Sequence, residues 1–177
     1  FALDANTTGD SNVAVGKSAL TTSTTASDNT AVGFFGLAAL TTGAGNTAVG
    51  KDAGQLITTG NYNVAIGLDS LESVTTGADN TAVGYYALQA NTGSGNTAFG
   101  RSAMAANTSG ETNAAFGYQS LDANTTGGSN TVVGYQAMTD NTTGSSNVAV
   151  GKNALSNNET ADYNTAVGHS ALGANTT

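Results

Sequence analysis

The chain repeats itself at a fixed spacing along its whole length. Asn is followed four residues later by Gly at ten places, where the Asn residues are Asn12, Asn29, Asn46, Asn63, Asn80, Asn96, Asn113, Asn130, Asn147 and Asn164. Each step is 17 residues, except that the step from Asn80 to Asn96 is 16. Such a period indicates an architecture in which each copy contacts only its neighbours. Residues 1–177 are therefore expected to form a single repeat array, with both ends cut within a copy.

Each copy, counted from its Asn as position 1, contains two short apolar segments. Position 5 is always Gly, position 3 is Ala except at Val132, position 4 is Val, Ile or Phe, and position 9 is Leu or Met except at Gly54. A Thr/Gly turn closes most copies. The segments are too short for helices, and a central Gly would weaken a helix further. The pattern predicts an all-β fold, a parallel β-solenoid of the β-roll or β-helix type with 17-residue repeats, about ten turns and two short strands per turn.

Stacking of the copies would place equivalent residues in axial rows, which we call ladders. Positions 4 and 9 are expected to face inward, so that Ala at positions 3 and 8 faces outward, because neighbouring strand residues point to opposite sides. For Asn at position 1, an amide ladder and an Asx turn both remain open. Gly at position 5 predicts a bend or a positive φ. The expected structural ladders include Asn29, Val32, Gly33, Asn80, Val83, Gly84, Leu88, Asn130, Val133, Gly134 and Met138.

Composition argues against several classes of function. The formal net charge is −8 with only 4 Lys and Arg residues, which disfavours binding to nucleic acid or to an anionic membrane surface. Cys is absent, and no apolar run approaches the roughly 20 residues of a membrane-spanning helix. The acidic residues lack calcium-site spacing, and His169 is the only histidine. We therefore expect no enzyme activity, no catalytic residues, no cofactor, no metal and no membrane insertion.

The copies NTAVGYYAL and NTVVGYQAM, with NTTG in the following turn, resemble repeats of phage tail fibres and of related bacterial surface proteins. Those repeats often precede a self-cleaving intramolecular chaperone domain. The N-x-A-V-G core is also similar to the shorter β-roll repeat in the heads of trimeric autotransporter adhesins. The resemblance implies an extracellular, fibrous and usually homotrimeric protein used for attachment.

Position 6 carries all four cationic residues, interleaved with aromatic residues. This ridge is interpreted either as a surface for a partner or a glycan, or as stacking that shields a strand edge. Its residues are Lys17, Phe34, Lys51, Tyr85, Arg101, Tyr118, Tyr135 and Lys152.

Position 12 changes from Leu40, Ile57 and Val74 to Asn in the later copies. Most of these Asn residues begin Asn-x-Thr/Ser sequons, which predicts either a file of N-linked glycans or a turn-forming Asn without sugar. The sequons begin at Asn6, Asn107, Asn124, Asn141, Asn158 and Asn175.

The function that these observations favour is a structural and adhesive shaft of an extracellular filament, such as a phage tail fibre or a surface adhesin. It would be located outside the cell, on the cell surface or on a virion. The expected partners are further copies of the chain, as a homotrimer or as an end-to-end filament, and cell-surface glycans. A ligand-binding or ice-binding β-solenoid is the alternative. It is less favoured because the adjacent Thr residues at positions 13 and 14 would face opposite sides of a strand.

Overall fold

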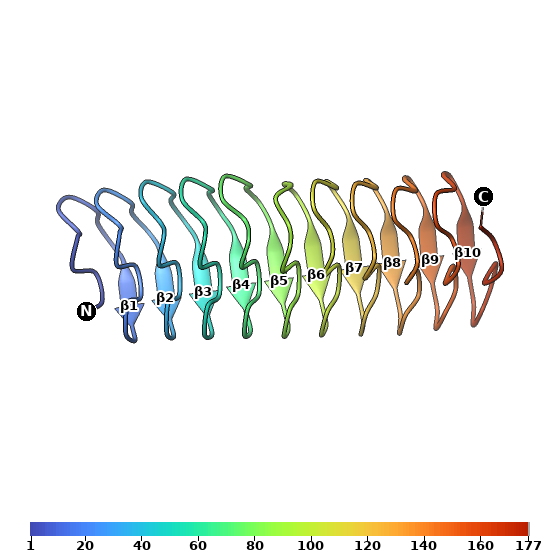
Figure 1. The fold of residues 1–177 in the computed structure, drawn as a ribbon, viewed down its shortest axis with the longest axis horizontal. Coiled ribbons are helices and arrows are strands. Elements are labelled where there is room, and N and C mark those ends of the chain that lie inside the picture. The colour runs from blue at the N-terminus through green and yellow to red at the C-terminus, as the bar shows by residue number, and fades with distance from the viewer. Residues whose placement is uncertain (177) are drawn as a thin grey trace.

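The computed structural model, which describes residues 1–176, is a straight rod of stacked coils with the two termini at opposite ends (Figure 1). Each copy contributes one three-residue strand, and the ten strands form a single parallel sheet in chain order. The predicted parallel β-solenoid is confirmed, with about nine turns. The strands are β1 (Val13–Val15), β2 (Thr30–Val32), β3 (Thr47–Val49), β4 (Val64–Ile66), β5 (Thr81–Val83), β6 (Thr97–Phe99), β7 (Ala114–Phe116), β8 (Thr131–Val133), β9 (Val148–Val150) and β10 (Thr165–Val167).

The register places each repeat position on its equivalent in the next copy. Ala31 pairs with Ala48 and Val32 pairs with Val49, and the same rule holds along the sheet. It also survives the shortened copy, where Val83 pairs with Phe99. The missing residue is therefore absorbed in the turn before Asn96, where a change of length leaves the sheet intact.

The second predicted strand of each copy does not form, because positions 6 to 11 fold into consecutive turns. Positions 7 and 9 take left-handed backbone conformations, with φ values of 56° at Phe35 and 49° at Leu37. Such a conformation costs roughly 1–2 kcal/mol for a non-glycine residue. Hydrogen bonds between coils offset this cost, since Phe35 N–H donates to Lys17 O (3.1 Å) and Leu37 N–H donates to Ala53 O (3.1 Å).

The interior of the rod is lined by positions 3, 8, 9 and 12. Ala31 is fully buried, whereas Val32 is 36% exposed and Val133 is 40% exposed. Val83 is also partly exposed. The predicted inward orientation of position 4, and the outward orientation of Ala at positions 3 and 8, are therefore wrong. Position 9 does face inward, as predicted, at the fully buried Leu88 and Met138.

The narrowness of the coil explains this reversal. A Cβ built on Gly36, at position 8, would lie 3.6 Å from the Cβ of Ala31 on the opposite wall. This distance is ordinary van der Waals contact between two methyl groups. A larger side chain at position 3 would need more space than the coil offers in most copies, so position 3 is Ala and the bulkier position 4 points out.

Asn at position 1 forms the amide ladder. Asn46 Nδ2 donates to Asn29 Oδ1 at 3.1 Å, and the backbone N–H of Asn46 donates to the same oxygen at 2.9 Å. Asn46 Nδ2 also donates to Gly60 O within its own coil at 2.9 Å. The ladder thus joins consecutive coils and closes each coil on itself, which decides between the two predicted roles of this Asn.

Gly at position 5 is required both by its backbone angle and by the proximity of the next coil. Gly33 has a φ of 141°, which confirms the predicted positive φ. A Cβ on Gly33 would lie 2.2 Å from the carbonyl oxygen of Gly50. No other residue fits this row without moving the backbone.

A second amide ladder occupies position 12 in the later copies. Asn124 Nδ2 donates to Asn107 Oδ1 (2.6 Å) and to Gly127 O (2.9 Å). Both Asn107 and Asn124 are fully buried, as are Asn141 and Asn158. A glycan on these four side chains would have no space inside the folded coil, which favours the alternative of a structural Asn without sugar.

The sequons at the two ends differ from these four. Asn6 is exposed, and its Nδ2 donates to Gly9 O at 3.0 Å. Asn175 is partly exposed and continues the position-12 ladder, with Nδ2 donating to Asn158 Oδ1 at 3.0 Å. Glycosylation of Asn6 stays a prediction, and the bond of Asn175 marks that side chain as structural.

Candidate interaction surfaces

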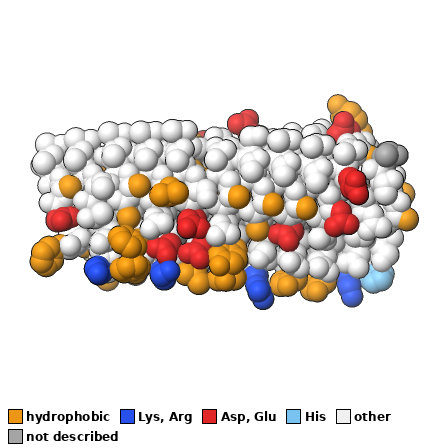
Figure 2. Space-filling view, viewed as in Figure 1, with side chains coloured by type: hydrophobic (Ala, Val, Ile, Leu, Met, Phe, Trp, Pro, Cys, Tyr) orange, Lys and Arg blue, Asp and Glu red, His pale blue; other side chains and the backbone are white. Residues whose placement is uncertain are grey.

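The position-6 side chains lie along one edge of the rod, where the space-filling view shows the cationic and large apolar groups gathered (Figure 2). The opposite edge in that view carries few charged or apolar side chains. The structure thus brings the predicted ridge together, and three of its four cations lie next to an aromatic ring. The distances from cation to ring centroid are 5.6–5.8 Å and join Lys17 to Phe34, Arg101 to Tyr85 and Tyr118, and Lys152 to Tyr135.

Two rings of the ridge, Tyr118 and Tyr135, stack along the rod axis, so that they cover one another. The centroids of Tyr118 and Tyr135 are 5.1 Å apart and their planes differ by 13°. Arg101 covers the other face of Tyr118, and Lys152 covers the other face of Tyr135. A sugar that packs against the face of an aromatic ring therefore has no free face within this stack. The ridge presents ring edges, hydroxyl groups and cationic groups instead.

One cation of the ridge, Lys51, has different surroundings from the other three. Lys51 Nζ lies 2.7 Å from Asp52 Oδ2, the single ion pair in the described part of the chain, and this hydrogen bond raises the pKa of Lys51. Asp69 lies in the next coil, where desolvation and the nearby Glu72 carboxylate raise its pKa. The charge of Lys51 is therefore offset by carboxylates. Lys17, Arg101 and Lys152 contact aromatic rings instead.

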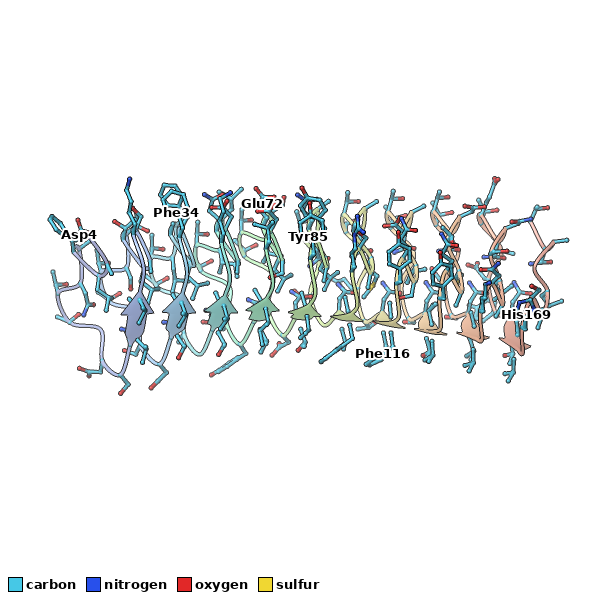
Figure 3. All side chains as sticks on the ribbon, turned by 90° about the horizontal axis from the view of Figure 1, so that it is seen from below. Asp4, Phe34, Glu72, Tyr85, Phe116 and His169 are labelled. Carbon is cyan, nitrogen blue, oxygen red and sulfur yellow. The ribbon has the colours of Figure 1, made fainter. Side chains whose placement is uncertain are left out.

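The outer face of the sheet is a second candidate surface, which the sequence analysis missed. Positions 2 and 4 point outward from every strand and include no charged residue. Phe99 and Phe116 are 43% and 40% exposed, and their rings stack at 5.8 Å. Phe116 lies on the strand side of the rod, away from the edge that carries Phe34 and Tyr85 (Figure 3). The signal was present in the sequence, since position 4 accepts Val, Ile and Phe while position 3 is almost always Ala.

The described residues show no arrangement typical of a catalytic or metal site. His169 is exposed, and the only group near its ring nitrogen is Ser170 Oγ, at 3.2 Å from Nδ1. Within residues 1–176 there is no cluster of three or more potential metal ligands, and no pocket is present. The same residues include no helix that could cross a membrane.

The fold and these surfaces define the class of the protein, which is a parallel β-solenoid repeat protein. Comparisons with protein families, with curated proteins and with solved structures gave no match.

Proposed function

We propose that this solenoid is the shaft of an extracellular fibre, such as a phage tail fibre or a surface adhesin. The observation that carries the proposal is the continuity of axial hydrogen bonding. Strand pairing joins β1 to β10 without a break, and the Asn ladder and the turn hydrogen bonds run parallel to it. Every interior coil is therefore bonded to both neighbours on several sides, which resists bending and extension. At about 4.8 Å per coil, length grows in proportion to copy number.

The outer face of the sheet is proposed as the contact between copies of the chain in a homotrimer. It is free of charge, and its apolar row continues from Val15 to Val167. A partner with the same axial repeat can place one side chain against each coil of this row. Another copy of the chain has the same repeat because it has the same sequence. The Ala residues at positions 3 and 8, which were expected to face outward, lie inside the rod and are closed to any partner.

Sedimentation velocity tests this contact. The purified chain is expected to sediment as an oligomer, and Phe99→Lys with Phe116→Lys should shift it to the monomer, because charge would be placed in an apolar interface. The matched control is Thr59→Lys with Thr126→Lys, which changes two exposed residues at position 14 on another face. A native chain that sediments as a single monomer at all concentrations, with no longer assembly, would refute the shaft proposal.

An ice-binding surface is the second candidate, because the same sheet face carries a row of Thr at position 2. Thr30, Thr47, Thr81 and Thr97 point outward together with the Val row at position 4. The two rows form an array with spacings of about 4.8 Å along the rod and about 7 Å across it. The bulky Phe99 and Phe116 interrupt its flatness. Thermal hysteresis of the purified chain would support this candidate, and its absence would eliminate it.

A further inference from the structure

Tyr118 and Tyr135 form a pair that the fold holds together. They occupy position 6 in consecutive coils, with ring centroids 5.1 Å apart and planes within 13° of parallel. The backbone beside them is bonded, since Gln136 N–H donates to Tyr118 O at 3.0 Å. Gln136 Nε2 also donates to Gln119 Oε1 at 2.9 Å. Contact between the two phenol rings therefore persists as long as these two coils stay folded.

The surroundings of the pair limit what each ring can meet. Arg101 lies 5.8 Å from the Tyr118 centroid, and Lys152 lies 5.6 Å from the Tyr135 centroid, so a cation covers the outer side of each ring. The nearest phenol partner of each ring is then the other ring. Tyr135 is 48% exposed, so a soluble oxidant can reach its edge and hydroxyl group.

We propose that Tyr118 and Tyr135 are a site of oxidative cross-linking, at which a peroxide-driven one-electron oxidant joins the two rings as dityrosine. Each phenol loses one electron and one proton to give a phenoxyl radical. The radicals form a carbon–carbon bond between the ring carbons next to the hydroxyl groups, and both rings regain aromaticity as the two ring hydrogens move to the oxygens. The net loss is two electrons and two protons, which reduce one hydrogen peroxide to two water molecules. Proximity favours this pair because coupling within the stack needs no encounter between molecules.

The other tyrosines provide an internal comparison. Tyr62 and Tyr163 are more exposed, at 66% and 83%, but neither contacts another aromatic ring among residues 1–176. Tyr85 and Tyr86 are in contact, with centroids 3.8 Å apart, but belong to one coil. Only the pair Tyr118 and Tyr135 would join two coils covalently. Such a bond would act as a staple that restricts the unfolded chain, much as a disulfide does. This inference depends on the coil geometry alone and stands apart from the proposed fibre function.

The experiment treats the dilute folded chain with a haem peroxidase and limiting hydrogen peroxide, then digests it with a protease that cleaves before aspartate. Cleavage at Asp122 separates Tyr118, in peptide 79–121, from Tyr135, in peptide 122–139. The expected product is these two peptides joined with the loss of two hydrogen atoms, together with dityrosine fluorescence. The stapled chain should also unfold about 5–10 °C higher.

Two variants make the outcome decisive. Tyr118→Phe keeps the stacked ring and should abolish the joined peptide, whereas Tyr163→Phe should leave its yield unchanged. Hydrogen loss confined to peptide 79–121 would assign the oxidation to Tyr85 and Tyr86 and overturn the proposal. Cross-links dominated by peptides 52–68 and 162–177, which contain Tyr62 and Tyr163, would overturn it equally, because exposure and not stacking would then decide the product.

Discussion

Two regions of the rod fill the same interior position with opposite chemistry. Position 12 holds Leu40, Ile57 and Val74 in three early coils and Asn in the later coils, and the aliphatic side chains and the Asn side chains from Asn91 to Asn158 are fully buried. Burial of each aliphatic side chain contributes roughly 1.5–3 kcal/mol. Each amide hydrogen bond in the later coils contributes only about 0.5–1.5 kcal/mol net, but an unpaired buried amide is costly. The stabilisation from the aliphatic row is therefore a sum of separate contributions. The stabilisation from the amide row depends on every Asn having its hydrogen-bonded neighbours.

The junction between the two regions shows how this dependence is met. Asn91 is the first amide of the later row, and its Oδ1 accepts from Asn107 Nδ2 at 2.6 Å. The same oxygen accepts from Asn96 Nδ2 at 3.2 Å, so the position-12 and position-1 ladders touch at this point. The contact falls in the copy that is one residue shorter. The oxygen of the first amide thus accepts from two donors, and on this side the apolar row ends without an unpaired amide.

The largest expected effect comes from placing one amide in the apolar region. In Ile57→Asn the neighbours Leu40 and Val74 offer no polar partner, although Gly60 O could accept one N–H. We expect a loss of about 3–5 kcal/mol in the free energy of unfolding, from lost apolar burial and an unpaired amide oxygen. Denaturant titration measures this loss. A change below about 1 kcal/mol would show that the two regions are interchangeable.

The reverse substitution tests the amide region. Asn124→Leu removes the donor to Asn107 Oδ1 and the acceptor of Asn141 Nδ2, and it leaves Gly127 O with one donor fewer. The expected loss is about 2–4 kcal/mol, measured by denaturant titration. The control Asn157→Leu changes an exposed amide in the same half of the rod and should have little effect. Equal losses for the two variants would refute the ladder as a source of stability.

A smaller effect is expected at the junction. Asn91→Val extends the apolar row by one coil beside Val74, and Asn96 and Asn107 keep their bonds to Gly110 O at 2.8 and 2.9 Å. The gain in apolar burial partly compensates for the lost acceptor, so we expect a loss of only about 1–2 kcal/mol. Thermal unfolding measures it. A loss as large as that of Asn124→Leu would mean that the ladder needs its first member as much as an interior one.

The smallest effect concerns pH. Burial raises the pKa of Asp122, in the amide region, and burial followed by Glu72 raises that of Asp69, in the apolar region. A carboxyl with a raised folded-state pKa destabilises the fold when ionised, so stability falls as pH rises through that pKa. Asp122→Asn should therefore be more stable than the native chain at neutral pH by less than about 1 kcal/mol, and the difference should vanish below about pH 4. Asp69→Asn should change less, because Asp69 is better solvated. Melting temperatures at the two pH values test this, and a difference that grows on acidification would contradict it.

The repeat spacing was sufficient to predict the solenoid, the register and the interior ladder of Leu and Met. It could not predict the direction of Ala31 and Val32, because alternation fixes only that they point to opposite sides. The deciding quantity is the width of the coil, which depends on the left-handed turns at residues such as Leu37. Those turns oppose the usual preference of Leu and are stabilised by bonds to neighbouring coils. For the same reason the glycosylation motif at Asn124 could not reveal that this side chain is buried. Its burial follows from the path of the coil and not from the motif.

The hydrogen bonds of the amide ladder at position 1 all run in one direction along the rod. Asn46 donates to Asn29, Asn63 donates to Asn46, and the direction never reverses among the position-1 pairs. A folded coil at the growing end of the rod therefore exposes an Asn side-chain oxygen on its C-terminal side. This oxygen can accept hydrogen bonds from the coil that follows in the chain. Synthesis from the N-terminus delivers the donors in that order. Each new coil thus supplies the side-chain donors that complete the amide bonds of the coil before it.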